Sequence, residues 1–203
     1  MRYPEQGGVC RPGGLELTRR LLEVARLPQG SRMLDVGCGS GTTLNLLRQQ
    51  GYEARGIDAC PQGAADADVG RAEALPYEDG MFSGLLMECC LSDFKEPEHA
   101  LLEAARVLEA GGWLLVTDVY ARGEEACCRF RLDCRERVEG RLKQAGFRLV
   151  CFEDCSWVLR EFWAQLVWEH GRDALCGMGL DGTVLRRAKA GYYLAAARKE
   201  GQL

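Results

Sequence analysis

The chain carries a glycine-rich segment, Met33-Leu-Asp-Val-Gly-Cys-Gly-Ser-Gly-Thr42, that predicts its fold class. Its apolar run ends in an acid, Asp35, and glycine then occupies every second position, at Gly37, Gly39 and Gly41. Each glycine removes a side chain where the backbone turns sharply and a ligand comes close. Residues 42–50 have the pattern of a helix, so the glycines lie between a strand and a helix N-terminus. Open α/β sheets bind nucleotides at such a turn.

Two acids indicate which nucleotide this turn suits. In dinucleotide sites the helix N-terminus faces a pyrophosphate, and a carboxylate at the position of Asp35 would repel that group. Asp35 fits better with a cationic ligand that carries an amino group. Asp58 ends the next apolar segment, Glu53–Asp58, and an acid there suits a ribose diol. An ammonium, a ribose and no phosphate describe S-adenosylmethionine (SAM).

Four motifs in the expected order make the chain resemble the class I SAM-dependent methyltransferases. Asp35–Gly41 matches their first motif, and Gly56-Ile-Asp58 matches the acid of their second strand. Residues 71–82 resemble the segment that covers the adenine, and residues 105–118 resemble a helix, a turn and the fifth strand. The likeness extends from about residue 11 to residue 198. It predicts the fold and the cofactor and does not identify the substrate.

The resemblance implies an α/β fold, a Rossmann-like sandwich with helices on both faces of a mostly parallel sheet. Seven strands are expected in the order 3-2-1-4-5-7-6, with the last strand antiparallel. The alternation of apolar strand and helix patterns along the chain agrees with this fold class. We expect one domain over residues 1–203, with a helical N-terminal cap region at 1–30 and a helical insertion at 156–190, before the last strand.

The cofactor-binding residues expected from the matched motifs belong to four strand ends and loops. They are Asp35, Gly37, Cys38, Gly39, Gly41, Asp58, Ala59, Ala72, Glu73 and Glu88. Two departures affect the adenine segment, because Arg71 and Ser83 stand where the family often carries acids. Glu73 or backbone groups are then the expected partners of the adenine amino group.

The composition is that of a globular enzyme domain. The 203 residues include 47% apolar and 28% charged residues, with a net charge of -4, and the pI is about 5.4. An acidic chain is a poor match for a phosphate backbone, so we expect no nucleic-acid partner. No apolar run approaches the length of a membrane span, and the N-terminus has no signal-peptide core. We therefore expect a cytoplasmic enzyme with a small-molecule substrate and no membrane partner, and we leave a homodimer open.

The catalytic residues are not identified by the sequence. Methyl transfer needs proximity and orientation above all, and a general base only for a protonated acceptor. Cys89 and His170 are weak candidates, and His99 is expected at the surface. Substrate contacts are expected from residues 1–18, 88–97, 120–134 and 156–189.

Eleven cysteines without Cys-x-x-Cys spacing predict reduced thiols, several of them buried, and no resident metal. One alternative is a thiol cluster for a soft ligand. Cys89 and either Cys127 or Cys128 match metalloid-binding positions of arsenite methyltransferases, although the chain lacks those enzymes' cysteine-bearing segment between the first two strands. Three hypotheses follow: a small-molecule methyltransferase, which we favour, a metalloid methyltransferase, and a SAM-binding protein without turnover.

Overall fold

The computed structural model describes residues 11–201, apart from 62, 65, 129 and 172–180. Its α-helices are α1 (Gly14–Ala25), α2 (Thr42–Gln49), α3 (Pro97–Val107), α4 (Arg135–Gln144), α5 (Ser156–His170) and α7 (Gly182–Arg187), with a short 3-10 helix η1 (Leu91–Asp93). Its strands are β1 (Arg32–Val36), β2 (Glu53–Asp58), β3 (Asp68–Val69), β4 (Phe82–Glu88), β5 (Leu108–Tyr120), β6 (Ala126–Cys127), β7 (Arg131–Leu132), β8 (Phe147–Asp154) and β9 (Gly191–Lys199).

A seven-stranded sheet runs through the molecule in the order β3-β2-β1-β4-β5-β9-β8. β1 pairs in parallel with β2 and with β4, and β4 pairs in parallel with β5. β9 is antiparallel to both of its neighbours, β5 and β8. The small β6–β7 hairpin is separate from this sheet. The predicted strand order, the reversed last strand and the Rossmann-like fold class are confirmed.

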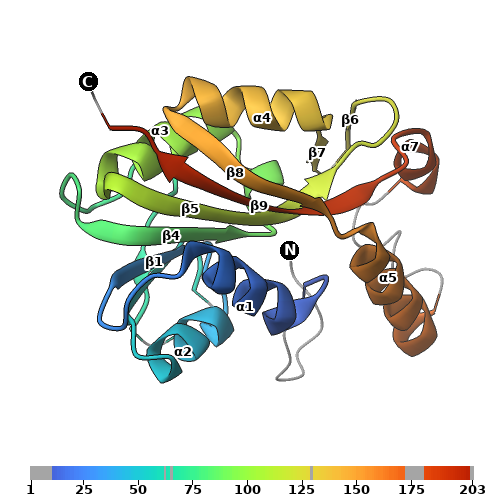
Figure 1. Cartoon of the computed structure of the whole chain (residues 1–203). Helices are drawn as coiled ribbons and strands as arrows, with labels where there is room; N and C mark the ends of the chain where they lie inside the picture. The colour runs from blue at the N-terminus through green and yellow to red at the C-terminus, as the bar shows by residue number, and fades with distance from the viewer. Residues whose placement is uncertain (1–10, 62, 65, 129, 172–180, 202–203) are drawn as a thin grey trace.

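Helices cover both faces of the sheet (Figure 1). The hydrophobic core on one face includes buried residues of α3 and α4, among them Leu101 and Leu142. The core on the other face includes Leu21 of α1, Leu47 of α2 and Leu159 of α5. These contacts come from buried apolar residues that recur at helical spacing along α1, α3 and α4. Burying them is the main stabilising contribution to the fold.

The structure differs from the sequence prediction mainly in its shortest elements. Residues 105–118 are expected to hold a helix, a turn and the fifth strand, and β5 occupies most of them, extending from Leu108 to Tyr120. The β6–β7 hairpin was not predicted, because its two-residue strands are too short to show a periodicity. Two helices, α5 and α7, are described within residues 156–190, and their assignment to an insertion remains a prediction. The division into one domain with a cap region remains a prediction.

The carboxyl ends of β1, β2, β4 and β5 lie at one edge of the sheet, because these strands are parallel. Ligands of open α/β sheets bind beyond this edge. Among the described residues, no helix combines the length and the apolarity that a bilayer crossing requires.

Candidate functional site

The glycine turn joins the end of β1 to the start of α2. Gly37, Gly39 and Gly41 have φ values of 77°, 52° and 78°, a left-handed conformation that favours glycine. The amide of Gly37 donates to the carbonyl of Ile57 at 2.8 Å, which fixes the turn against β2. A Cβ on Gly39 would meet no atom within 4 Å, so the space beside it is open. The turn therefore presents bare backbone to a ligand.

Asp35 is a buried acid near the end of β1, two residues before the first glycine of this turn. Asp35 is 2% exposed, and its Oδ2 has no hydrogen-bond partner within the described residues. Burial, together with the nearby carboxylates of Glu88 and Asp58, raises the pKa of Asp35 to about 7, although the Arg11 guanidinium opposes the shift. A buried carboxylate oxygen without a partner is costly, and a ligand ammonium would satisfy it.

Asp58 combines a turn role with a place in the site. Its Oδ2 accepts a hydrogen bond from the amide of Gly39 at 3.0 Å, and its Oδ1 accepts from the amide of Cys60 at 2.8 Å. Asp58 is half-buried and Ala59 is exposed. The acid at the end of β2 is therefore held beside the second glycine of the turn. In this place it stabilises the turn and can also accept a hydrogen bond from a ribose hydroxyl.

Glu88 has its oxygens occupied by other side chains. Oε1 accepts from the Thr18 hydroxyl at 2.8 Å. Oε2 accepts from the Arg11 guanidinium at 2.8 Å and from the Thr43 hydroxyl at 2.9 Å. This network ties the segment before α1, the start of α2 and the end of β4 together. The main role of Glu88 is thus to hold these three segments of the site together.

Arg11 is a residue that the sequence prediction missed. Besides Glu88, its Nη2 donates to Thr18 at 2.7 Å and to Thr43 at 2.9 Å. Its side chain is 15% exposed. Desolvation by itself lowers the pKa of Arg11, but the negative charges of Glu88 and Asp35 outweigh it, so the pKa is raised. No spacing rule links Arg11 to an acid 77 residues away, so local patterns carry no signal for this pair.

Residues expected to border the adenosine lie in two places. Ala72 is buried and Glu73 is partly buried, with its carboxylate 3.3 Å from Arg71. The Cys38 sulfur points inward, because a Cβ on Gly56 would lie 2.9 Å from it. Burial raises the pKa of the Cys38 thiol to about 12, so it is neutral. Cys38 therefore contributes its backbone to the turn, and its sulfur does not take part in the turn's surface.

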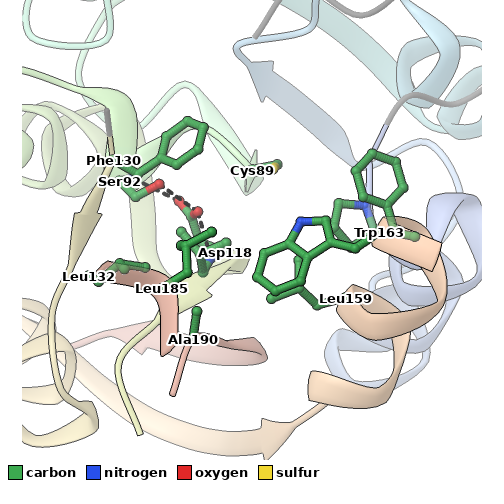
Figure 2. A pocket seen from close by; sticks show the side chains of 12 residues that line it. Cys89, Ser92, Asp118, Phe130, Leu132, Leu159, Trp163, Leu185 and Ala190 are labelled. Carbon is green, nitrogen blue, oxygen red and sulfur yellow. Dashed lines mark hydrogen bonds between the residues drawn. The ribbon is translucent and has the colours of Figure 1, made fainter. Parts of the chain in front are cut away.

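A pocket that opens to solvent lies beside the ends of β4 and β5. Figure 2 shows Trp163 and Leu159 of α5 on one side and Phe130, Leu132 and Leu185 on the other. Most of its lining residues are apolar; the polar ones are Cys89, Ser92 and Asp118. Nine of the twelve lining residues come from the four segments in which substrate contacts were expected, whereas Asp118, Val119 and Ala190 lie just outside those segments.

Asp118 supplies the charge of this pocket. The residue is 1% exposed, and its Oδ1 accepts from the Ser92 hydroxyl at 2.8 Å and from the amide of Val119 at 2.7 Å. Its Oδ2 accepts from the amide of Ser92 at 2.8 Å. Burial raises the pKa of Asp118 to about 6, although these hydrogen bonds oppose the shift. The carboxylate is thus largely ionised at neutral pH.

Cys89 lies in the pocket in a strained conformation. Its φ is 57°, which is uncommon for a residue with a side chain, and its amide donates to the carbonyl of Thr117 at 2.7 Å. Burial, reinforced by the charge of Asp118, raises the pKa of the thiol to about 12. A thiol that stays protonated at neutral pH is a weak nucleophile and a weak metal ligand.

The remaining catalytic and metalloid candidates receive no support from the geometry. His99 is exposed, as expected, with Nδ1 3.2 Å from Glu96. His170 ends α5, and its side chain lies outside the described residues. Cys127 is exposed on β6, and Cys128 is half-buried beside it. In the described part of the chain, no three His, Cys, Asp or Glu side chains are grouped closely enough to hold a metal ion.

Comparisons with known proteins agree on the fold. A family model described as "Methyltransferase domain" matches residues 34–116. Norajmaline N-methyltransferase of Rauvolfia serpentina is 34% identical over 100 residues, which cover 41% of this chain and 34% of that protein. The chain thus aligns with about a third of that relative's length.

Two solved structures extend the likeness over nearly the whole chain. One, the [4+2]-cyclase SpnF, is 26% identical with a TM-score of 0.71, covering 92% of this chain and 81% of that chain. The other is phosphoethanolamine N-methyltransferase 2 of Haemonchus contortus in complex with S-adenosyl-L-methionine. It is 18% identical with a TM-score of 0.72, covering 94% of this chain and 54% of that chain, and it shows a shared fold.

Proposed function

We propose that this chain, which belongs to the class I SAM-dependent methyltransferases, transfers the methyl group of SAM to a small-molecule acceptor. The observation that carries the proposal is the buried Asp35 oxygen without a hydrogen-bond partner, next to a turn of bare glycine backbone. An ammonium and a close-fitting nucleoside satisfy both features at once. A cytoplasmic location and a homodimer remain predictions from the sequence.

The residues present fit the cofactor. Asp35 would pair with the ammonium, Asp58 with a ribose hydroxyl, and the backbone at Gly37 and Gly39 would face the ligand. Ala72 and Glu73 are the proposed neighbours of the adenine. When bound, SAM supplies an already activated methyl group on a sulfonium. The chain's part is then to orient the acceptor and exclude water, and the apolar pocket beside Cys89 and Asp118 is suited to both.

The direct experiment is incubation of the full chain with SAM and a panel of small metabolites, scored by the release of S-adenosylhomocysteine. We expect acceptor-dependent release that stops in a variant without SAM affinity. If SAM binds normally but no acceptor increases the release of S-adenosylhomocysteine, methyl transfer to a small molecule is contradicted.

A second candidate is a SAM-binding protein that does not transfer the methyl group. It is supported by the likeness to a protein named as a [4+2]-cyclase, which covers 92% of this chain. The pocket's apolar lining also suits a reaction that needs confinement rather than a base. SAM binding without S-adenosylhomocysteine release across the panel would favour this candidate.

The affinity for SAM is expected to fall as the pH drops below about 7. The pKa of Asp35 is about 7 in the ligand-free protein, and a bound cation favours its ionised form. Below that pH, binding must therefore expel a proton, and the dissociation constant should rise by up to about tenfold per pH unit. The measurement is titration from about pH 5.5 to about pH 7, where an α-ammonium stays charged. A flat profile, or the same profile in Asp35→Asn, would contradict this assignment.

Asp58→Ala is expected to weaken SAM binding by about 1–3 kcal/mol, because a ribose hydroxyl and the amide of Gly39 both lose an acceptor. Isothermal titration measures the change. Asp66→Ala is the matched control, since that acid is exposed and pairs with Arg48 at the surface. An unchanged dissociation constant in Asp58→Ala would show that another group holds the ribose.

A further inference from the structure

The pocket beside β4 and β5 combines an apolar wall with one buried charge. Trp163 and Leu159 face Phe130 and Leu185 across it (Figure 2). Asp118 stands at its inner side, where Ser92 and Val119 orient the carboxylate through three hydrogen bonds. An occupant must therefore offer mostly apolar surface together with one group that suits a fixed carboxylate.

Within the described residues, Asp118 has hydrogen-bond donors but no cation paired with it. Arg131 and Arg141 line a neighbouring pocket with Asp118, but they pair with Glu98 and Asp133 instead. None of the ion pairs found in the described ranges includes Asp118.

The buried carboxylates of Asp35 and Glu88 lie at the same edge of the sheet. The cation near them, Arg11, forms its ion pair with Glu88. A buried anion without a cation is costly, so the pocket gains most from a positively charged occupant.

We propose that the methyl acceptor is an amine on a compact, mostly apolar skeleton, and that Asp118 binds its ammonium group. This inference rests on the proposed function and adds the substrate class. A neutral hydroxyl acceptor would donate a hydrogen bond to Asp118 but leave its charge uncompensated. An ammonium satisfies the hydrogen bond and the charge together, and its hydrocarbon part fills the space between α5 and the residues opposite.

The same contact accounts for the proton that the reaction must remove. The ammonium gives one proton to the Asp118 carboxylate, and the nitrogen regains its lone pair. That pair forms the nitrogen–carbon bond as the carbon–sulfur bond of the donor breaks, and the electrons of the broken bond stay on sulfur. The product leaves as a methylated ammonium, and Asp118 returns its proton to water. One proton is released for each methyl group transferred.

The test compares two probes with one skeleton, naphthylmethylamine and naphthylmethanol. Their affinities for the full chain are measured by isothermal titration with S-adenosylhomocysteine present and absent. We expect the amine to bind at least about tenfold more tightly than the alcohol, and Asp118→Asn to reduce this preference to about threefold or less. Asp93→Asn, which removes an exposed acid next to Ser92, should keep the preference.

A second variant locates the probes and does not depend on the fold of Asp118→Asn. Leu185→Trp narrows the pocket from its outer side, so both probes should bind at least about tenfold more weakly while the amine preference stays. The inference is overturned if the alcohol binds as well as the amine, if Asp118→Asn keeps the preference, or if Leu185→Trp changes neither affinity. Acceptor-dependent release of S-adenosylhomocysteine by the same wild-type sample separates these outcomes from failure of the proposed function.

Discussion

Gly39→Val is expected to fold and to lose SAM affinity by a factor of at least about one hundred. The new Cβ would enter open space beside the turn, since no atom lies within 4 Å of it. The branched side chain then occupies the place where the nucleoside approaches the backbone. A loss of this size corresponds to about 2.7 kcal/mol. Equilibrium dialysis with radiolabelled SAM measures it.

The control for Gly39→Val separates steric exclusion from backbone strain. Gly146→Val places valine at another positive φ, 84°, also with no atom within 4 Å, at the far end of β8 from the site. Each variant has a strain cost of order 1–3 kcal/mol, which a typical folding free energy tolerates. We expect Gly146→Val to bind SAM normally. Micromolar binding retained by Gly39→Val would remove the glycine turn from the cofactor site.

Glu88→Ala is expected to destabilise the protein by about 3–5 kcal/mol. It leaves the guanidinium of Arg11 without its carboxylate in a site where the side chain is 15% exposed, and two threonine hydroxyls lose an acceptor. Breaking a buried pair from one side has this cost, because the remaining charge stays desolvated. Urea denaturation at neutral pH measures the free energy of unfolding.

Two further variants test the cause of that loss. Glu153→Ala removes a half-exposed partner of Arg20 on α1 and should cost about 1 kcal/mol or less. Replacing both members of the buried pair, Arg11→Met with Glu88→Leu, should be less destabilising than Glu88→Ala alone. If Glu88→Ala behaves like Glu153→Ala, then Arg11 reaches water and the pair does not hold the site together.

The sequence was sufficient for the parts of the site that depend on local structure. Apolar runs that end in Asp35 and Asp58 predict strands, and the glycines predict the turn, because these features follow from backbone conformation within a few residues. The parallel sheet then brings the strand ends to one edge. The role of Asp35 toward a cationic ligand stays a prediction, and the buried Oδ2 without a partner among the described residues is the observation behind it.

The parts that were not predictable depend on contacts between distant segments. Glu88 was expected near the ligand, but its partners Arg11, Thr18 and Thr43 lie 77, 70 and 45 residues away. The pocket is assembled from α5, α7, the hairpin and the loop after β4, and no sequence motif links these segments to one another. The positive φ of Cys89 is likewise imposed by its surroundings, since cysteine has no preference for it.

We propose that the turn after β1, together with the buried carboxylate of Asp35, binds SAM. Equilibrium dialysis of the full chain against radiolabelled SAM, with NADH as the competing nucleotide, tests it most directly. The structure predicts saturable binding of one SAM per chain that NADH does not displace and that Gly39→Val abolishes. Retention of NADH with no binding of SAM would contradict it.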